Sequence, residues 1–560
     1  MRKTERVFTP ISDFKHLLTL MGAHGDKVLF DYFDREGNVH TLSYGGFEAR
    51  VLAFLSGLAS ENLVGKRIAV IGETSPAWYT AYFSAIIGGG VAIPLDKELA
   101  TNEIENFLVR AEADVVVFSL LFENKFRDMA KRHPEIVFLP MEKPTASAPY
   151  HAPMDEVIAA GAAHPFVPAD ARDLDRLTVL LFTSGTTGTS KCVMLSERNL
   201  CSNINAACAS VYFCAEDVLL SVLPVHHTYE LTCSLAGMCY GMEIAINDSL
   251  RHVMRNIQRF RPTALVLVPL FLTTMDKKIW DEIRKKGKVR FVKAALAASD
   301  GLRRIGLDAS SVLFREIRAA FGGRLQKIIV GGAPLDQHTA ATFRSLGIHV
   351  WEGYGITECS PLIAVDVYYK SKPGSVGPAV NCCTVRIEDT VPDEAGHAIG
   401  EICVHGENVM LGYYKDEEAT KAAFTEDGWF RTGDLGYTDK DGYIYITGRK
   451  KSVIVLENGK NVFPEEIEEY LATIDLIEEC VVVGRPTGEH GALRLTALIY
   501  PRRECFDPSA TETEIYDKIK AEIDKLNRRL LSYKQIHRIE LRDTPFEKTT
   551  SRKIKRHLVK

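Results

Sequence analysis

The chain has 560 residues, of which 46% are hydrophobic and 25% are charged, and its formal net charge at neutral pH is −5. The length gives a prior of about three to five domains, and the composition excludes a disordered, collagen-like or small disulfide-stapled chain. The charge balance gives no reason to expect nucleic acid as a partner. The twelve cysteines form no Cys-x-x-Cys pair, and no apolar run follows the charged N-terminus. We therefore expect reduced thiols, no secretory signal and a cytoplasmic location.

Short apolar runs alternate with amphipathic helical stretches over the first two thirds of the chain. The pattern predicts strands at 67–72, 114–119, 177–182, 264–268 and 326–330. Because helical stretches flank these strands, we expect βαβ units and two doubly wound α/β subdomains.

Residues 74–95 carry no charge and are long enough to cross a bilayer. Pro76, Pro94 and the glycines at 88–90 interrupt this stretch. A buried helix over 78–87 and a short strand over 91–93 therefore fit better than a membrane span.

The pattern changes near residue 362. From there to 448, short alternating strands and Gly/Asp turns predict an antiparallel, β-barrel-like subdomain. After residues 449–452 we expect a small α+β unit, with helices at 464–473 and 513–530 and strands at 480–483 and 496–500. The predicted organisation is an N-terminal domain over 1–448, a hinge at 449–452 and a C-terminal domain over 453–560.

The most informative motif is the run TSGTTGTSK at residues 183–191. Glycines leave backbone N–H groups unobstructed, and the hydroxyls and Lys191 add donors, so the composition suits a polyphosphate. A structural turn stays open as an alternative. A Walker A loop does not fit, because Ser190 and Cys192 replace its Gly and Ser/Thr. We instead expect a hairpin tip, followed by a strand at 191–195 and a helix capped by Ser196.

This run resembles the phosphate loop of the AMP-forming adenylating superfamily, which contains acyl-CoA synthetases, peptide-synthetase adenylation domains and beetle luciferases. Further segments follow in that superfamily's order: GGAP at 331–334, GYGITE at 353–358, WFRTGD at 429–434, GRKK at 448–451, NGKNVFPEEIE at 458–468 and KTTSRKI at 548–554. The chain is identified as a member of this superfamily. The resemblance implies a large adenylation domain, a small mobile C-terminal domain, and the use of ATP, Mg²⁺ and CoA.

The resemblance also implies how ATP and AMP are bound. It assigns the β- and γ-phosphates to the glycine loop, adenine to Tyr354, and the α-phosphate to Thr357. Mg²⁺ falls to Glu358, since a hard cation suits one carboxylate plus phosphate oxygens. Asp434 is implied to accept hydrogen bonds from both ribose hydroxyls. The full implied set for ATP and AMP is Thr183, Ser184, Gly185, Thr186, Thr187, Gly188, Lys191, Gly332, Ala333, Pro334, Glu352, Gly353, Tyr354, Gly355, Thr357, Asp434, Ile446, Arg449 and Lys553.

The implied catalytic residues are Lys553, Thr357, Glu358 and His227. Lys553 corresponds to the lysine that approaches the α-phosphate and the attacking carboxylate oxygen, although Arg552 replaces the usual glycine before it. Read locally, Lys553 belongs to a solvated basic tail. His227 matches the family's histidine beside the acyl pocket. His226 stands where the family commonly has an aromatic residue, so either ring could gate the pocket.

Two further assignments concern the transfer of the acyl group from the acyl-adenylate to CoA. Lys451 stands at the implied pivot of the hinge, where Asp is often found. Gly459 and Lys460 stand in the loop that would line the CoA tunnel after the C-terminal domain rotates.

The helical, partly basic segment 274–324 resembles that of long-chain fatty acyl-CoA synthetases. This implies a medium- or long-chain fatty acid as substrate and CoA as acceptor. Transfer to an acyl-carrier-protein thiol and a non-catalytic nucleotide-binding relative stay open as alternatives. The basic face is either solvated or in peripheral contact with anionic lipid on the inner membrane face.

Overall fold

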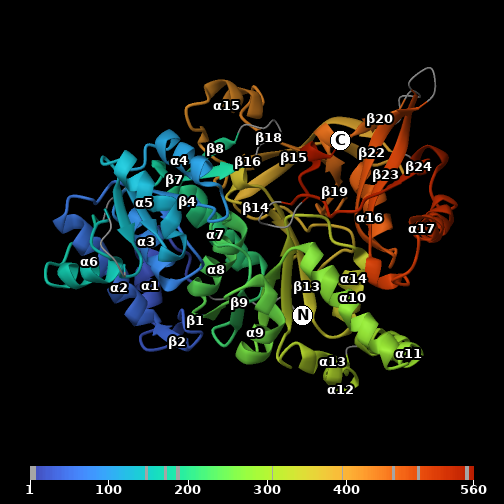
Figure 1. Cartoon of the computed structure of the whole chain (residues 1–560), viewed down its shortest axis with the longest axis horizontal. Coiled ribbons are helices and arrows are strands. Elements are labelled where there is room, and N and C mark those ends of the chain that lie inside the picture. The colour runs from blue at the N-terminus through green and yellow to red at the C-terminus, as the bar shows by residue number, and fades with distance from the viewer. Residues whose placement is uncertain are drawn as a thin grey trace.

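The computed structural model describes residues 8–144, 149–169, 173–183, 190–305, 307–393, 395–456, 461–487, 492–548 and 554–559. Figure 1 shows a first α/β region on the left, a second sheet in the centre and a C-terminal unit on the right. Five helices are not described further with the sheets: α1 (Phe14–Gly22), α6 (Met154–Ala162), α12 (Ser310–Leu313), α13 (Arg315–Ala320) and α15 (Glu417–Ala423). The 3₁₀ turns are η1 (Leu120–Phe122), η2 (Leu250–His252), η3 (Thr357–Cys359), η4 (Lys450–Ser452), η5 (Arg503–Cys505), η6 (Ser532–Lys534) and η7 (Arg556–Leu558).

A seven-stranded sheet forms the first region, in the order β17-β8-β7-β4-β3-β5-β6. Its strands are β3 (Arg67–Ile71), β4 (Val91–Leu95), β5 (Val115–Phe118), β6 (Val137–Pro140), β7 (Leu177–Thr183), β8 (Lys191–Ser196) and β17 (Gly412–Tyr413). The five strands from β7 to β6 are parallel. Four of them, β3, β4, β5 and β7, lie at predicted places, whereas β6 was not predicted. Alternate side chains enter separate cores, one beneath α2 (Tyr44–Ser60) and α3 (Pro76–Ile87), the other beneath α4 (Thr101–Arg110) and α5 (Glu123–Arg132). Helices therefore cover both faces of this sheet.

An eight-stranded sheet lies in the centre of the molecule, in the order β14-β13-β12-β11-β9-β10-β1-β2. Its strands are β1 (Val28–Phe33), β2 (Val39–Ser43), β9 (Val218–Ser221), β10 (Glu243–Ile246), β11 (Ala264–Leu267), β12 (Lys327–Gly331), β13 (His349–Gly355) and β14 (Leu362–Val365). Helices α7 (Glu197–Ser210) and α8 (Thr228–Cys239) share one core with both sheets. On the other face, α9 (Val253–Phe260), α10 (Pro269–Lys285) and α14 (Gln337–Ser345) form a second core with these strands, and α11 (Val289–Arg304) packs beside it. The predicted pair of α/β subdomains is confirmed.

The antiparallel character predicted for 362–448 is also confirmed, with two differences. The segment 362–365 is β14 of the central sheet. The remaining strands are β15 (Cys383–Pro392), β16 (Ala398–Gly406), β18 (Phe430–Thr438) and β19 (Ile444–Arg449), paired in that order. Because β15 and β19 do not pair among the described residues, these four strands form an open meander with two edges rather than a closed barrel.

The C-terminal unit has its own hydrophobic core. Its two helices and its two longest strands overlap the predicted ranges, whereas three shorter strands were not predicted. Its elements are β20 (Ile454–Val455), β21 (Asn461–Val462), α16 (Pro464–Ala472), β22 (Ile477–Thr487), β23 (Ala492–Pro501), α17 (Glu512–Asn527) and β24 (Arg538–Leu541). It contacts α10 through two ion pairs, Arg284 with Asp475 at 2.9 Å and Arg502 with Asp281 at 2.6 Å. Charged side chains thus hold this unit against the central sheet.

The cysteines and the uncharged stretch behave as expected. All twelve thiols are free. Residues 74–95 become α3, a glycine turn and β4. In the part of the chain that the structure describes, no helix is long and apolar enough to cross a membrane.

A buried ion pair ties three strands of the central sheet together at their amino ends. Lys327 of β12 pairs with Asp217, which precedes β9, and both residues are about 5% exposed or less. Thr263, which precedes β11, donates its hydroxyl to the same carboxylate at 2.6 Å. Because the carboxylate is desolvated, it depends on these partners.

We predict that Lys327→Ala destabilises the protein by about 3–5 kcal/mol, since it leaves a buried carboxylate without its cation. Thermal unfolding measures the effect. Lys288→Ala, which removes an exposed partner 3.8 Å from Glu316, serves as the control and should change stability by less than about 1 kcal/mol. Equal melting temperatures for the two variants would contradict the prediction.

Candidate functional site

The glycine loop joins two antiparallel strands, as predicted. Thr183 at the end of β7 pairs with Lys191 at the start of β8. Helix α7 then begins after Ser196, whose side chain accepts from the Asn199 N–H at 3.1 Å. This hairpin differs from a Walker loop, in which the phosphate loop opens directly into a helix.

Several residues implied by the resemblance lie outside the described residues. They are Ser184, Gly185, Thr186, Thr187, Gly188, Gly459, Lys460 and Lys553.

Two parallel strands of the central sheet end side by side next to this hairpin base. Gly331 at the end of β12 is in register with Gly353 of β13. The turn Gly332-Ala333-Pro334 follows β12, and Gly332 has a φ of +85°, which suits glycine. Because ligands bind beyond the carboxyl ends of parallel strands, this edge is a candidate binding site.

One cluster at this edge joins three of the implied residues. The Tyr354 hydroxyl donates to Asp434 Oδ2 at 2.8 Å, and Arg449 Nε lies 2.9 Å from Asp434 Oδ1. Asp434 of β18 and Arg449 of β19 are in register, with Ile446 on the same strand. Asp434 is 4% exposed, so the two donors fix a nearly buried carboxylate. Burial, together with the charge of Asp434, holds the pKa of Tyr354 well above its usual range.

This arrangement adds to the expected role of Tyr354. The resemblance implies that its ring contacts adenine, whereas its hydroxyl is bound to the carboxylate implied for ribose. Each carboxylate oxygen has a second acceptor position, so both Asp434 oxygens retain capacity for a diol.

A second cluster contains a residue that the sequence did not single out. Tyr413 of β17 donates its hydroxyl to Glu358 Oε1 at 3.0 Å. The ammonium nitrogen of Lys191 lies 4.1 Å from the centroid of the same tyrosine ring. Glu358 and Thr357 form η3 directly after β13, and β17 pairs with β8. Tyr413 therefore contacts both the carboxylate implied for Mg²⁺ and the lysine implied for phosphate.

The histidine pair lies between the end of β9 and the start of α8. The two rings are 4.2 Å apart, and His226 Nε2 lies 3.7 Å from Asp96, which follows β4 of the other sheet. Burial lowers the pKa of both rings, so both are neutral at pH 7. His226 is 8% exposed and His227 is half-buried, so His227 presents the more accessible ring.

The predicted hinge directly follows the cluster of Tyr354, Asp434 and Arg449. Arg449 ends β19, and η4 leads from it to β20 of the C-terminal unit. Lys450 forms an ion pair with Glu401 at 2.8 Å. The next residue, Lys451, is exposed.

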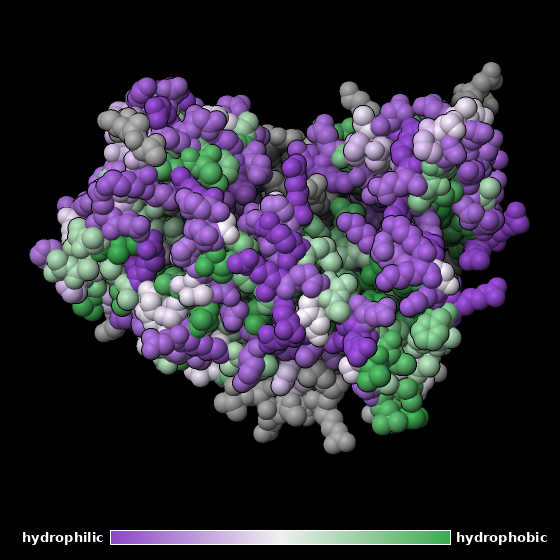
Figure 2. All heavy atoms as spheres, turned by 60° about the horizontal axis from the view of Figure 1, so that its bottom comes forward, coloured by the Kyte–Doolittle hydropathy of each residue, from purple (hydrophilic) through white to green (hydrophobic). Residues whose placement is uncertain are grey.

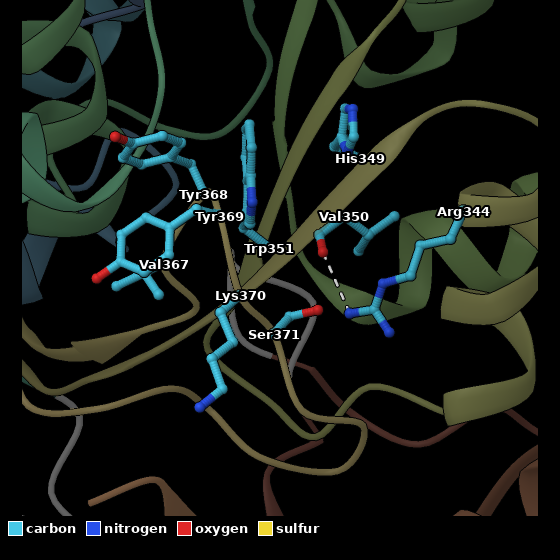
Figure 3. Close-up of a pocket in the computed structure, with 9 residues that line it drawn as sticks. All are labelled: Arg344, His349, Val350, Trp351, Val367, Tyr368, Tyr369, Lys370 and Ser371. Atoms are coloured by element: carbon cyan, nitrogen blue, oxygen red, sulfur yellow. Dashed lines mark hydrogen bonds between the residues drawn. The ribbon is translucent and has the colours of Figure 1, made fainter. Parts of the chain in front are cut away.

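A pocket of about 160 Å³ lies at the other end of β13. Figure 3 shows Arg344 donating to the Val350 carbonyl, at 3.2 Å. Arg344 also lies 3.6 Å from the carboxylates of Glu352 and Asp366. Because burial raises the pKa of Glu352 to about 6 and that of Asp366 to about 8, this cation serves to offset buried acids. The pocket lies at the opposite end of β13 from the two clusters, and Arg344 already contacts a carbonyl and two carboxylates of the protein.

Comparison with known proteins places most of the chain in one family. The family model described as AMP-binding enzyme matches residues 21–414, and that of the AMP-binding enzyme C-terminal domain matches residues 451–560. A long-chain-fatty-acid–CoA ligase, FadD15 of Mycobacterium bovis, is 31% identical over 77% of this chain and 72% of its own length. The peroxisomal long chain acyl-CoA synthetase 6 of Arabidopsis thaliana is 27% identical over 84% of this chain and 69% of its own.

Solved structures extend the likeness to the fold. ATP-bound MatB from Rhodopseudomonas palustris superposes with a TM-score of 0.73 and 26% identity, covering 97% of this chain and 98% of the other. The adenylation domain of a carboxylate reductase from Mycobacterium chelonae gives a TM-score of 0.79 at 20% identity, covering 98% and 89%, and shows the shared fold alone.

Proposed function

The chain belongs to the AMP-binding enzyme family, and from that membership we propose that it activates a medium- or long-chain fatty acid with ATP and transfers the acyl group to CoA. The observation that carries this proposal is the convergence of two clusters at one sheet edge. Lys191, Tyr413 and Glu358 form one, and Tyr354 and Asp434 belong to the other. Together they offer partners for a triphosphate and for a ribose.

The chemistry requires a carboxylate to approach the α-phosphate of ATP, so two anions must be brought together. Positioning and cationic stabilisation therefore provide most of the catalysis. Lys191 would offset the negative charge of the departing pyrophosphate. The hydroxyls of Ser184, Thr186 and Thr187 would donate hydrogen bonds to it. Thr357 would donate to the α-phosphate.

Glu358 would hold Mg²⁺, which takes oxygen ligands from one carboxylate, phosphates and water and supplies positive charge beside the phosphates. Its carboxylate is only half-buried, so it can reach a cation, and the Tyr413 hydroxyl fixes one oxygen. Tyr413 is thus a positioning residue in this proposal.

The cluster of Tyr354, Asp434 and Arg449 would bind the nucleoside. Asp434, fixed by the Tyr354 hydroxyl and Arg449, would accept from the ribose hydroxyls, and the Tyr354 ring would contact adenine. The neighbouring ends of β12 and β13, with Gly332, Ala333, Pro334, Glu352, Gly353 and Gly355, and Ile446 of β19 complete the proposed set.

The nature of the acid and of the acceptor rests on the relatives. FadD15 and the Arabidopsis enzyme are named for long-chain acyl substrates and CoA. These names favour CoA over an acyl-carrier-protein thiol. A neutral histidine pair between the two sheets is compatible with an acyl pocket, with His227 as the ring beside it.

The two half-reactions would use two positions of the C-terminal unit. Lys553 would approach the α-phosphate during adenylation and then leave, so that the loop containing Gly459 and Lys460 could line the path of the CoA thiol. Rotation about Lys451 would break the ion pairs of Asp475 and Arg502 with α10.

We predict that ATP is converted to AMP and pyrophosphate in a reaction that depends on the fatty acid. A panel of carboxylates from two to twenty carbons, assayed for AMP release with CoA, should give its highest kcat/KM with medium or long chains. ADP and phosphate as the acid-dependent products would overturn the proposal.

Tyr413→Phe should slow adenylation roughly tenfold or more, because a hydrogen bond to a charged group is lost. The Mg²⁺ concentration needed for half the maximal rate should rise, while the ring beneath Lys191 is kept. Tyr414→Phe is the matched control, since that hydroxyl bonds to Glu112 at 2.7 Å instead. A normal Mg²⁺ dependence in Tyr413→Phe would refute the positioning role.

Lys553→Ala should abolish most acyl-adenylate formation and leave thioester formation from supplied acyl-adenylate nearly intact. Lys451→Pro, which restricts φ at the pivot, should do the reverse. Single-turnover assays of each half-reaction separate the two. Equal impairment of both steps by Lys553→Ala would count against two positions of the C-terminal unit.

A further inference from the structure

Helix α11 exposes an apolar stripe on the face turned away from the protein. Phe291 is 70% exposed and Ile305, one residue beyond the helix, is 71% exposed. Between them lie Ala294, Ala298 and Gly301, all exposed and spaced alternately by three and four residues. This spacing places the five positions along one side of the helix.

The opposite side of α11 is fixed in the fold. Val292 is buried, and Ala295 and Leu296 pack against the core beneath α14. The Ser299 hydroxyl donates to the Ser345 carbonyl of α14 at 2.9 Å. The stripe is therefore a rigid surface feature, because the residues that anchor the helix are already engaged elsewhere.

The apolar surface continues past the end of the helix. Leu307, Val312 and Leu313, in the connection to α12 and in α12 itself, are 57%, 79% and 39% exposed. Figure 2, with the underside of Figure 1 turned forward, shows apolar side chains gathered at its lower right, in the region of α11 and α12. We call Phe291, Ile305, Leu307, Val312 and Leu313 the apolar patch. Contiguous exposed apolar surface of this kind marks an interaction site.

Positive charge surrounds the apolar patch. Residues 285–318 contain nine Lys and Arg and three Asp and Glu, a net charge of +6, whereas the whole chain carries −5. Lys286, Arg290 and Lys293 are exposed, and no described carboxylate forms an ion pair with them. Lys288 has Glu316 as a partner at 3.8 Å. The chain thus concentrates cations beside its exposed apolar side chains.

We propose that the apolar patch and its flanking cations dock the protein on an anionic lipid surface. An amphipathic helix with aromatic and aliphatic side chains on one side and cations beside them binds in the plane of a lipid interface. Anionic headgroups complement the charge of +6. A second copy fits less well, because a two-fold contact would place the same cations of both chains opposite one another. The docking goes beyond the proposed function, and it would bring the protein to the phase into which an apolar acid partitions.

Vesicle flotation tests the proposal directly. The full-length protein should float with vesicles of 70% phosphatidylcholine and 30% phosphatidylglycerol, and far less with pure phosphatidylcholine. Binding should weaken as salt is raised, because surface charges are screened. Phe291→Glu/Ile305→Glu should lower the partition coefficient at least tenfold for anionic vesicles.

Lys286→Glu/Lys293→Glu should lower the partition coefficient for anionic vesicles by about 25-fold or more, at about fivefold for each cation lost. The matched controls are Leu121→Glu, at an apolar side chain 60% exposed on the first region, and Lys440→Glu, at an exposed lysine of the meander. Both should float like the wild type. Unchanged melting temperatures establish that the variants are folded.

Three results would overturn the proposal. One is a wild-type protein that fails to float with anionic vesicles, and another is equal flotation of the patch variants and the controls. The third is a wild-type dimer that Phe291→Glu/Ile305→Glu converts to a monomer in light scattering, which would assign the patch to self-association. Because flotation needs no turnover, its outcome is independent of the proposed reaction.

Discussion

The hydrogen bond between Tyr413 and Glu358 joins parts of the site that come from different sheets. Glu358 follows β13 of the central sheet, whereas Tyr413 lies on β17, the edge strand beside the hairpin of the first sheet. Lys191 of that hairpin lies over the same ring. A cation and a carboxylate that would serve one triphosphate are therefore set at a fixed separation by a single side chain. Since β17 has only two residues, this alignment depends on a short edge pairing.

The nucleoside cluster follows the same principle of fixing a charge before a ligand arrives. Asp434 is nearly buried, and its two oxygens are bound by Tyr354 of the central sheet and Arg449 of the meander. A carboxylate that is already oriented loses little freedom on binding a diol. The Tyr354 contact also ties the meander to the central sheet, and β19, which carries Arg449, leads straight into η4. Orientation of Asp434 and placement of the proposed hinge are thus linked by one strand.

Periodicity predicted four of the five parallel strands of the first sheet, and two helices and two strands of the C-terminal unit, because their apolar runs are short and bounded by turns. The hairpin was predictable because Ser190 and Cys192 exclude a Walker loop and Ser196 caps the next helix. Strands β1 and β2 escaped prediction, since they join a sheet whose other strands begin near residue 218. The role of Tyr413 was not predicted either, because nothing in the run GYY at 412–414 indicates that its hydroxyl bonds to a residue 55 positions earlier in the chain. The role of Lys553 stays a prediction from the resemblance.

The central claim is that the acid is activated by forming a bond to the α-phosphate of ATP, and isotope transfer tests it most directly. A fatty acid labelled with ¹⁸O in both carboxylate oxygens is incubated with ATP, Mg²⁺, CoA and the enzyme, and the products are examined by mass spectrometry. Attack on the α-phosphate followed by thiol attack on the carbonyl leaves one labelled oxygen in each AMP, which is the result predicted here. Unlabelled AMP, or label in inorganic phosphate, would contradict the account.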